Sequence, residues 1–293
     1  MEFSKASTLG TDFLQRGGQP SPGDVSNEGL NNSDMDKSRW RILKGDSYRN
    51  LSTVIVLPTP TDFIHNRVEG AIDGLMKPMN QAIAGPMRMS GQLPMEKIQV
   101  CGWEVGDAYN AAIKNIQGGD MKKWRFLLTV EHDNLPPPDG LLRLMNRMYE
   151  NADKDEEGRI KEDKNGVLQF HFLGIGGLYW TKGFEQGQPM IYGNPKEFPR
   201  NYHPQLPVVD ALQECNGIAM GFSIWNLSAL MNDKRLAQPT WFETKNNWSP
   251  STGVRAGTQD LVFCSKAAEL GYKFAVDTSV KVGHFDFTTG MVF

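Results

Sequence analysis

Short apolar runs alternate with amphipathic stretches along the chain. Thr53–Leu57, Ile98–Cys101 and Lys123–Val130 are strand-length runs rich in apolar or β-branched residues. Residues 63–84 and 103–116 lie between them, and their apolar positions recur at helical spacing. This strand–helix–strand–helix–strand order predicts parallel strands joined by right-handed crossovers.

The second half of the chain continues this alternation with longer irregular stretches. Residues 174–207 are rich in Gly and Pro with aromatic residues interleaved, which is typical of a functional loop, and residues 233–257 predict a second long loop. The expected helices and strands around these loops are 140–151, 167–173, 258–271 and 272–276. The sequence as a whole predicts an α/β fold, Rossmann-like, with a mixed, mainly parallel central sheet flanked by helices.

The first 50 residues have a different character. Residues 1–50 are rich in Ser, Gly, Asn and Asp and show no apolar periodicity. Such a composition predicts a flexible or loosely docked N-terminal segment. We therefore expect a single folded domain over residues 51–293.

Composition and charge narrow the class of protein. The chain has 293 residues, is 39% hydrophobic and carries a net charge of −3, which is ordinary for a globular protein and lacks a global basic signature for nucleic acid. Its apolar runs fall short of the roughly 20 residues of a membrane helix. Cys101, Cys215 and Cys264 are widely spaced, which fits reduced thiols, so we expect a cytoplasmic protein.

The most informative stretch follows the third predicted strand. Glu131-His132-Asp133 comes directly after the apolar run, and Pro136-Pro137-Pro138 prevents the strand from continuing. These side chains are therefore expected just past the C-terminal edge of a strand, where open α/β sheets bind ligands. A carboxylate pair there suits a hard cation, and such a cation usually serves a phosphate-bearing substrate. The pattern predicts an enzyme site at this turn.

Four segments, in this order, resemble the family 2-like glycosyltransferases of the GT-A fold. Val54–Pro60 resembles their first strand and nucleotide-contacting loop, and Glu131–Asp133 stands where they carry the DxD metal motif. Gly257–Asp260 resembles their acidic ED helix start, and Val282–His284 resembles the late histidine of the metal site. The resemblance spans residues 51–286. It departs from the family pattern in Glu131, where Asp is usual, and in Gln259, which precedes Asp260.

The resemblance implies a metal-dependent glycosyltransferase that moves a sugar from a nucleotide-diphosphate donor to an acceptor hydroxyl. Asp133 and His284 would bind Mn²⁺ or Mg²⁺, which neutralises charge on the leaving diphosphate. Asp260 would be the general base of an inverting reaction, although its place near a helix start also suits a helix-capping role. Glu131 is expected either to bind the metal, a coordinated water or the donor ribose, or to serve as a helix cap or salt-bridge partner. A structural role is expected for His132.

Other residues are assigned to the substrates. The donor would be contacted by the loop after the first strand and by Glu131, with further contacts from an early helix and a late Gly-rich segment. The additional residues in this set are Pro58, Thr59, Thr61, Asp62, Glu104, Asn216 and Gly217. Glu104 is equally suited to a structural role. Asp286 is expected to orient His284, and Lys182 could contact a phosphate.

The acceptor and two other functional classes stay open. The acceptor is a sugar, a protein side chain, a lipid-linked carrier or a modified DNA base. A nucleotidyltransferase acting on a sugar phosphate would use a similar fold, but Pro58–Asp62 lacks the glycines and arginine typical of that class. A non-catalytic binding or virion-associated module that keeps the fold is the third reading; Asp133, Asp260 and His284 together argue against it.

Overall fold

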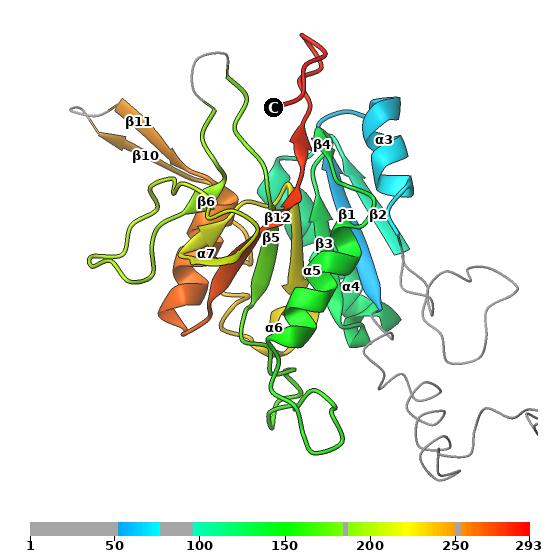
Figure 1. Ribbon diagram of the computed structural model, residues 1–293, viewed down its shortest axis with the longest axis vertical. Coiled ribbons are helices and arrows are strands. Elements are labelled where there is room, and N and C mark those ends of the chain that lie inside the picture. Colours follow the sequence, from blue (N-terminus) through cyan, green and yellow to red (C-terminus); the bar gives the residue numbers. More distant parts are fainter. Residues whose placement is uncertain (1–51, 77–95, 184–186, 250–252) are drawn as a thin grey trace, which may run out of the picture. The chain divides into compact units, whose positions relative to one another are not determined.

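The structure is a computed structural model that describes residues 52–76, 96–183, 187–249 and 253–293 (Figure 1). The predicted N-terminal segment, residues 1–50, lies outside the described residues, so the division of the chain at residue 51 stays a prediction. The fold is mixed α/β, as predicted, with a seven-stranded central sheet in the order β2-β1-β3-β9-β5-β12-β7.

The sheet is mostly parallel. β1 pairs in parallel with β2 and β3, and β5 pairs in parallel with β12. β9 runs antiparallel to both β3 and β5, and β7 runs antiparallel to β12, so five of the seven strands point the same way. The strands of this sheet are β1 Thr53–Thr59, β2 Glu96–Cys101, β3 Phe126–Val130, β5 Gly174–Leu178, β7 Leu212–Cys215, β9 Phe222–Asn226 and β12 Phe274–Lys281.

Helices cover both faces of the sheet. On the chain these are α3 Asn66–Asp73, α4 Val105–Gly118, the 3₁₀ helix η2 Asp120–Lys123, α5 Gly140–Glu150, α6 Leu227–Asn232 and α7 Gln259–Glu269. Alternate residues of β1 point to opposite faces, as strand geometry requires. Val54 and Val56 belong to one apolar core with residues of α4, α6 and α7, whereas Ile55 and Leu57 belong to a second core with residues of α3 and α5.

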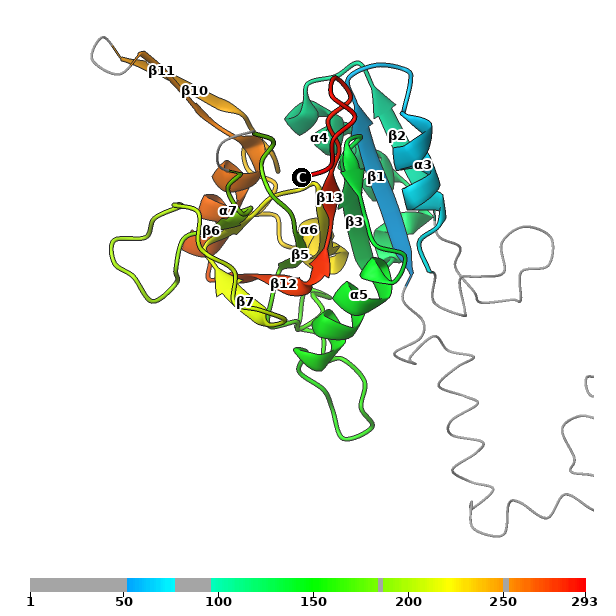
Figure 2. The same cartoon turned by 45° about the horizontal axis from the view of Figure 1, so that its top comes forward.

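Shorter pairs of strands decorate the sheet. β4 Asn134–Leu135 pairs with β13 Gly283–His284, and β6 Ile191–Tyr192 pairs with β8 Gly217–Ile218. β10 Lys245–Ser249 and β11 Gly253–Gly257 form an antiparallel hairpin that extends away from the sheet beside α7 (Figure 2). The sequence had predicted only a loop over residues 233–257, so this hairpin corrects it.

The strand predicted at residues 167–173 is wrong. These residues make only isolated bridges, and the strand is instead β5, which the sequence pattern had assigned to a Gly-rich loop. A Cβ on Gly174 would lie 2.8 Å from the Trp225 ring, and one on Gly177 would lie 2.8 Å from Val282. Large neighbouring side chains therefore fill the space that β5 leaves, and the glycines mark close packing inside a sheet.

The end of the first helix and the end of β1 also differ from the prediction. The helix expected over residues 63–84 ends at Asp73, followed by Gly74 as C-cap, and residues 77–95 lie outside the described residues. β1 does not stop before Pro58: Pro58 pairs opposite Val100 of β2. Pairing with β3 has already ended, at Val56 opposite Thr129, so the missing N–H of Pro58 is tolerated on that side.

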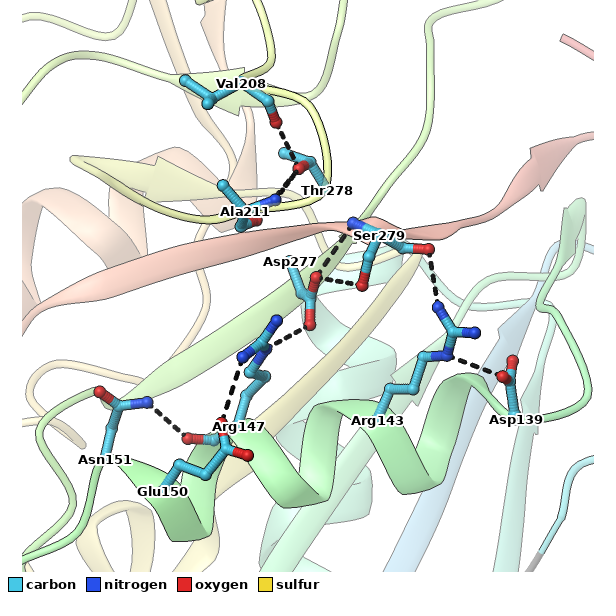
Figure 3. A network of polar contacts seen from close by, with 10 residues as sticks. All are labelled: Asp139, Arg143, Arg147, Glu150, Asn151, Val208, Ala211, Asp277, Thr278 and Ser279. Carbon is cyan, nitrogen blue, oxygen red and sulfur yellow. Dashed lines mark hydrogen bonds and ion pairs between the residues drawn. The ribbon is translucent and has the colours of Figure 1, made fainter.

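A polar network ties α5 to the strand β12 (Figure 3). Nε of Arg147 lies 2.8 Å from Oδ2 of Asp277, whose side chain is 1% exposed. Oδ1 of Asp277 accepts hydrogen bonds from the backbone N and the hydroxyl of Ser279, at 3.0 and 2.6 Å. One turn earlier on α5, Arg143 joins Asp139 to the carbonyl of Ser279. This network fixes β12 and the chain that follows it, which contains His284.

Candidate active site

The candidate site lies at the C-terminal edge of the parallel strands. Glu131-His132-Asp133 follows β3, Thr59 ends β1, and Trp180 and Lys182 follow β5. The chain after β12 returns to the same edge, because β13 pairs with β4 and places His284 opposite Asn134. The backbone N of Phe285 also donates to the carbonyl of Asp133, at 2.7 Å.

This pairing brings the two predicted metal ligands together. Nε2 of His284 lies 3.3 Å from Oδ2 of Asp133, and the two side chains are 14% and 13% exposed. Nζ of Lys182 lies 2.5 Å from the same oxygen. Burial opposes ionisation of Asp133, but hydrogen bonds from His284 and Lys182 outweigh it and hold the pKa of Asp133 well below its usual range. Asp133 is therefore an ionised carboxylate at neutral pH.

The second nitrogen of His284 defines its tautomer. Nδ1 lies 2.7 Å from the carbonyl oxygen of Trp180, and because a carbonyl only accepts, Nδ1 carries a proton. The hydrogen bond from Nε2 to Asp133 uses a second proton, so a metal ion that binds Nε2 would replace that proton. Metal-binding histidines commonly have this arrangement, with the distal N–H donated to a backbone carbonyl. Tyr179 packs edge-on against the ring, with centroids 5.6 Å apart.

Three carboxyl groups share this site. Burial, together with the charges of Asp133 and Asp260, raises the pKa of Glu131 to about 8, so both carboxyl groups lie within electrostatic reach of Glu131. Asp260 is 7% exposed at the start of α7, and burial raises its pKa too. The backbone N of Leu261 donates to Asp260 Oδ1, at 2.8 Å. Asp260 therefore acts on the Glu131–Asp133 turn through its charge, and His284 acts on it through its contact with Asp133.

Several buried side chains of β1, α4 and the turn after β3 have polar atoms without partners. Thr59 and Asn134 are 2% and 0% exposed, and among the described residues no hydrogen-bond partner is found for the Thr59 hydroxyl or for either amide atom of Asn134. The hydroxyl of Tyr109 is in the same condition, and its pKa is raised by burial and by the charges of Glu131, Asp260 and Asp133. Such atoms are costly unless a ligand or water satisfies them.

Other residues that were expected to contact the nucleotide sugar form hydrogen bonds within the protein. Glu104 caps α4: one carboxylate oxygen accepts from the backbone N of Asp107, at 3.1 Å, and the other accepts from the Thr244 hydroxyl, at 2.8 Å. Glu104 therefore has the structural role that was expected as the alternative to contact with the nucleotide. Thr61 and Asp62 are exposed, and the Thr61 hydroxyl donates to the carbonyl of Phe63, at 3.2 Å.

Asn216 and Gly217 also have structural partners. The Asn216 amide donates to the carbonyl of Asn201, at 2.9 Å, and Asn216 lines a cavity together with Arg200 and Lys273. A Cβ on Gly217 would lie 2.8 Å from Leu261 on α7. These contacts leave a donor role for both residues an untested prediction.

Two further expectations can be compared directly with the geometry. His132 stacks on Phe287, with ring centroids 5.4 Å apart, as a structural histidine would. The expected role of Asp286 in orienting His284 is wrong. Asp286 accepts from the backbone N of Thr288, at 2.8 Å, while the carbonyl of Trp180 orients the imidazole.

Sequence reasoning missed several members of the site. Lys182 was assigned to a phosphate, with no hint that it would pair with Asp133. Asn134 and Tyr109 were not singled out. The signal for Asn134 was its position beside Asp133 in a strand-end turn. Tyr179 belongs to the aromatic segment 176–183, which was expected either to stack on an acceptor or to form a small core, and both tyrosines are buried.

The residues fit a divalent cation that also binds substrate. Within the described ranges, no group of three or more His, Cys, Asp and Glu side chains is arranged to hold a metal alone. Asp133 and the Nε2 lone pair of His284 offer two ligands. Mg²⁺-type ions are typically held by one or two carboxylates, with substrate phosphates and waters completing the shell. The donor set therefore suits a cation that arrives with a phosphate-bearing ligand.

Comparisons with known proteins found a likeness to solved structures only. Neither the family models nor the curated proteins include a match to the chain. Among solved structures, the chain is similar to A197 from STIV, with 13% identity, a TM-score of 0.47, and coverage of 80% of this chain and 86% of that one. This likeness carries no functional argument. Across the described residues, the helices are too short or too polar to cross a membrane.

Proposed function

We propose that the chain is a GT-A-like glycosyltransferase that binds a nucleotide-diphosphate sugar at the Glu131–Asp133 turn. The observation that supports this most is the convergence of Glu131, Asp133 and Asp260 with His284. These residues come from three separate parts of the chain and meet at the strand edge where open α/β sheets bind ligands. Perturbed carboxyl groups gathered in this way are typical of active sites.

The donor would enter beside the end of β1. The unpaired hydroxyl of Thr59 and the unpaired amide of Asn134 supply buried hydrogen-bonding atoms for it. Pro58 lies within β1 and shapes the wall at this end of the strand. A ligand that satisfies these atoms gains the hydrogen bonds without paying again for their desolvation.

Asp133 and His284 would hold Mn²⁺ or Mg²⁺ through an ionised carboxylate oxygen and the Nε2 lone pair. The ion would supply positive charge to the diphosphate leaving group. The hydrogen bond from Nδ1 to the Trp180 carbonyl keeps the imidazole in the tautomer that this role needs.

Asp260 is the proposed general base. Its carboxylate is buried, so its pKa is raised and its affinity for the acceptor proton is increased. Oδ1 is held by the backbone N of Leu261 at the start of α7, which fixes the direction of the group. Deprotonation of the acceptor hydroxyl on the side opposite the leaving group would make the reaction inverting. The acceptor classes given above all remain predictions.

Replacement of the base separates transfer from binding. Asp260→Asn is expected to keep nucleotide-sugar binding, measured by calorimetry, and to lose sugar transfer or donor hydrolysis by at least about 100-fold, the lower range for general-base catalysis. Glu104→Gln serves as a control because Glu104 caps α4 and touches no residue of the carboxyl cluster in the contacts described. Full turnover by Asp260→Asn would remove Asp260 from the base role.

A further inference from the structure

Lys182 occupies the oxygen that a metal ion would need. Its Nζ lies 2.5 Å from Oδ2 of Asp133, the same atom that faces Nε2 of His284 at 3.3 Å. An ammonium ion and a divalent cation cannot both sit against this oxygen, because their charges repel strongly at such separation. The carboxylate therefore has a protein cation as its partner before any metal arrives.

The position of Lys182 allows it to leave. Its side chain is 29% exposed, compared with 13% for Asp133. Its Nζ also lies 5.7 Å from the centroid of the Phe287 ring, so the ring stays within reach of the charge when the ammonium moves off Oδ2. Lysine is a flexible, strongly hydrated point charge, and unlike arginine it is not held in a bidentate fork on the carboxylate.

We propose that Lys182 is an exchangeable counter-ion that controls entry of the divalent cation at Asp133. The metal binds by displacing the ammonium group from Oδ2. The displaced ammonium is then available to pair with the diphosphate of the donor. When the metal binds alone, the protein loses the Lys182–Asp133 ion pair. When the metal binds with a diphosphate, Lys182 gains a new partner. Metal and nucleotide therefore bind cooperatively, and this second half rests on the proposed donor site.

Manganese binding without nucleotide tests directly whether Lys182 competes with the cation for Asp133. The free Mn²⁺ signal in electron paramagnetic resonance gives the dissociation constant for the wild-type chain, Lys182→Met and Lys182→Arg. Removal of the competing charge is expected to tighten Mn²⁺ binding by about tenfold in Lys182→Met, within the usual 5–150-fold range of coupling between sites. Lys182→Arg keeps the charge and is expected to stay close to wild type.

Two further variants serve as controls. Asp133→Ala should remove the high-affinity Mn²⁺ signal in the Lys182→Met background, which assigns it to this site. Lys281→Met removes a lysine from a cavity beside Val208 and Val282 that neither Asp133 nor His284 lines, and it should leave Mn²⁺ affinity unchanged. Circular dichroism and the melting temperature establish that each variant is folded. Equal or weaker Mn²⁺ binding in Lys182→Met, or no Mn²⁺ binding by either chain, would overturn the proposal that Lys182 is an exchangeable counter-ion.

Nucleoside diphosphates then test the coupling. UDP and GDP are expected to tighten Mn²⁺ binding in the wild type by a larger factor than in Lys182→Met. Equal factors in both chains would contradict the coupling. If neither nucleotide binds, the proposed function fails, while the Mn²⁺-only comparison still decides the role of Lys182. The two failures are thus distinguishable.

Discussion

Removal of the charge on Asp277 gives the sharpest stability prediction. Asp277→Asn preserves the shape of the side chain. If its amide oxygen keeps the hydrogen bonds from Ser279, its NH₂ group faces Nε of Arg147, and neither group carries the charge that Arg147 pairs with. The Asp277 side chain is 1% exposed, and the Arg147 contact measures 2.8 Å (Figure 3). The hydrogen bond that Arg147 donates to Asp277 raises the pKa of Arg147, in keeping with a close pair.

The magnitude follows from the burial of the two partners. Removal of one member of a buried ion pair costs about 3–5 kcal/mol, because the other charge is left uncompensated. Arg147 is 33% exposed and can recover part of its hydration, so we expect a loss of about 2–3 kcal/mol for Asp277→Asn. The matched control is Glu150→Gln on the same arginine. Glu150 is 60% exposed, and its 3.2 Å contact should contribute less than about 0.5 kcal/mol.

Equilibrium unfolding in urea, followed by circular dichroism, measures both variants under the same conditions. The midpoint for Asp277→Asn should fall with an unchanged slope, and the midpoint for Glu150→Gln should stay within error of wild type. If Asp277→Asn costs less than about 0.5 kcal/mol, or if the two variants cost the same, the ion pair does not hold β12 to α5 and the reasoning is refuted.

Two other predictions concern the walls of the site and the far end of the sheet. Gly221→Ala should destabilise the chain by about 1–3 kcal/mol and lower ligand binding, because its Cβ would lie 2.5 Å from the Tyr179 hydroxyl and 2.6 Å from Oδ1 of Asn134; an unchanged melting temperature would contradict this packing. Hydrogen bonds from Arg235 lower the pKa of Asp233 to about 2, so the stability that Asp233 contributes is present above its unfolded pKa near 4 and is lost as the pH falls through about 2. Asp233→Asn should therefore be less stable than wild type at pH 7, and the difference should narrow below pH 4; a difference that stays constant from pH 7 to pH 3 would contradict the assignment.

The parts of the fold that the sequence predicted well are those where local pattern and tertiary environment agree. Thr53–Leu57 and Phe126–Val130 are apolar runs that lie in the middle of the sheet, and every residue of β3 is buried. The prolines after Asp133 correctly indicated that the strand ends there. The α/β class followed from the alternation of such segments, because each element carried its own signal.

The failures come from contacts between distant residues. β5 looked like a loop because Gly174, Gly176 and Gly177 have low strand propensity, but Trp225, Ser223 and Val282 supply the packing that the glycines lack. In the site, the contact between Asp133 and His284 depends on a two-residue pairing of β4 with β13. The family resemblance suggested that these residues would meet.

Lys182 shows the limit most clearly. Lys182 lies in a Gly-rich stretch with aromatic residues. That setting suggested contact with a phosphate but indicated no partner within the chain. Its contact with Asp133 arises because the chain after β5 crosses the same strand edge as the turn after β3. A charged partner separated by 49 residues cannot be read from local pattern, since exposed lysines are found throughout loops.

The central claim is that Asp133 joins a divalent cation to a nucleotide-diphosphate sugar. Isothermal titration of UDP-sugars and GDP-sugars, with Mn²⁺ and with EDTA, into wild type and Asp133→Ala tests it most directly. Wild type should bind at least one donor in a Mn²⁺-dependent manner. At a donor concentration 100 times the dissociation constant, binding should stabilise the fold by about 2.7 kcal/mol. Asp133→Ala should remain folded and lose that metal-linked binding. Absence of metal-dependent binding of any donor to the wild-type chain, or undiminished binding by Asp133→Ala, would contradict the account.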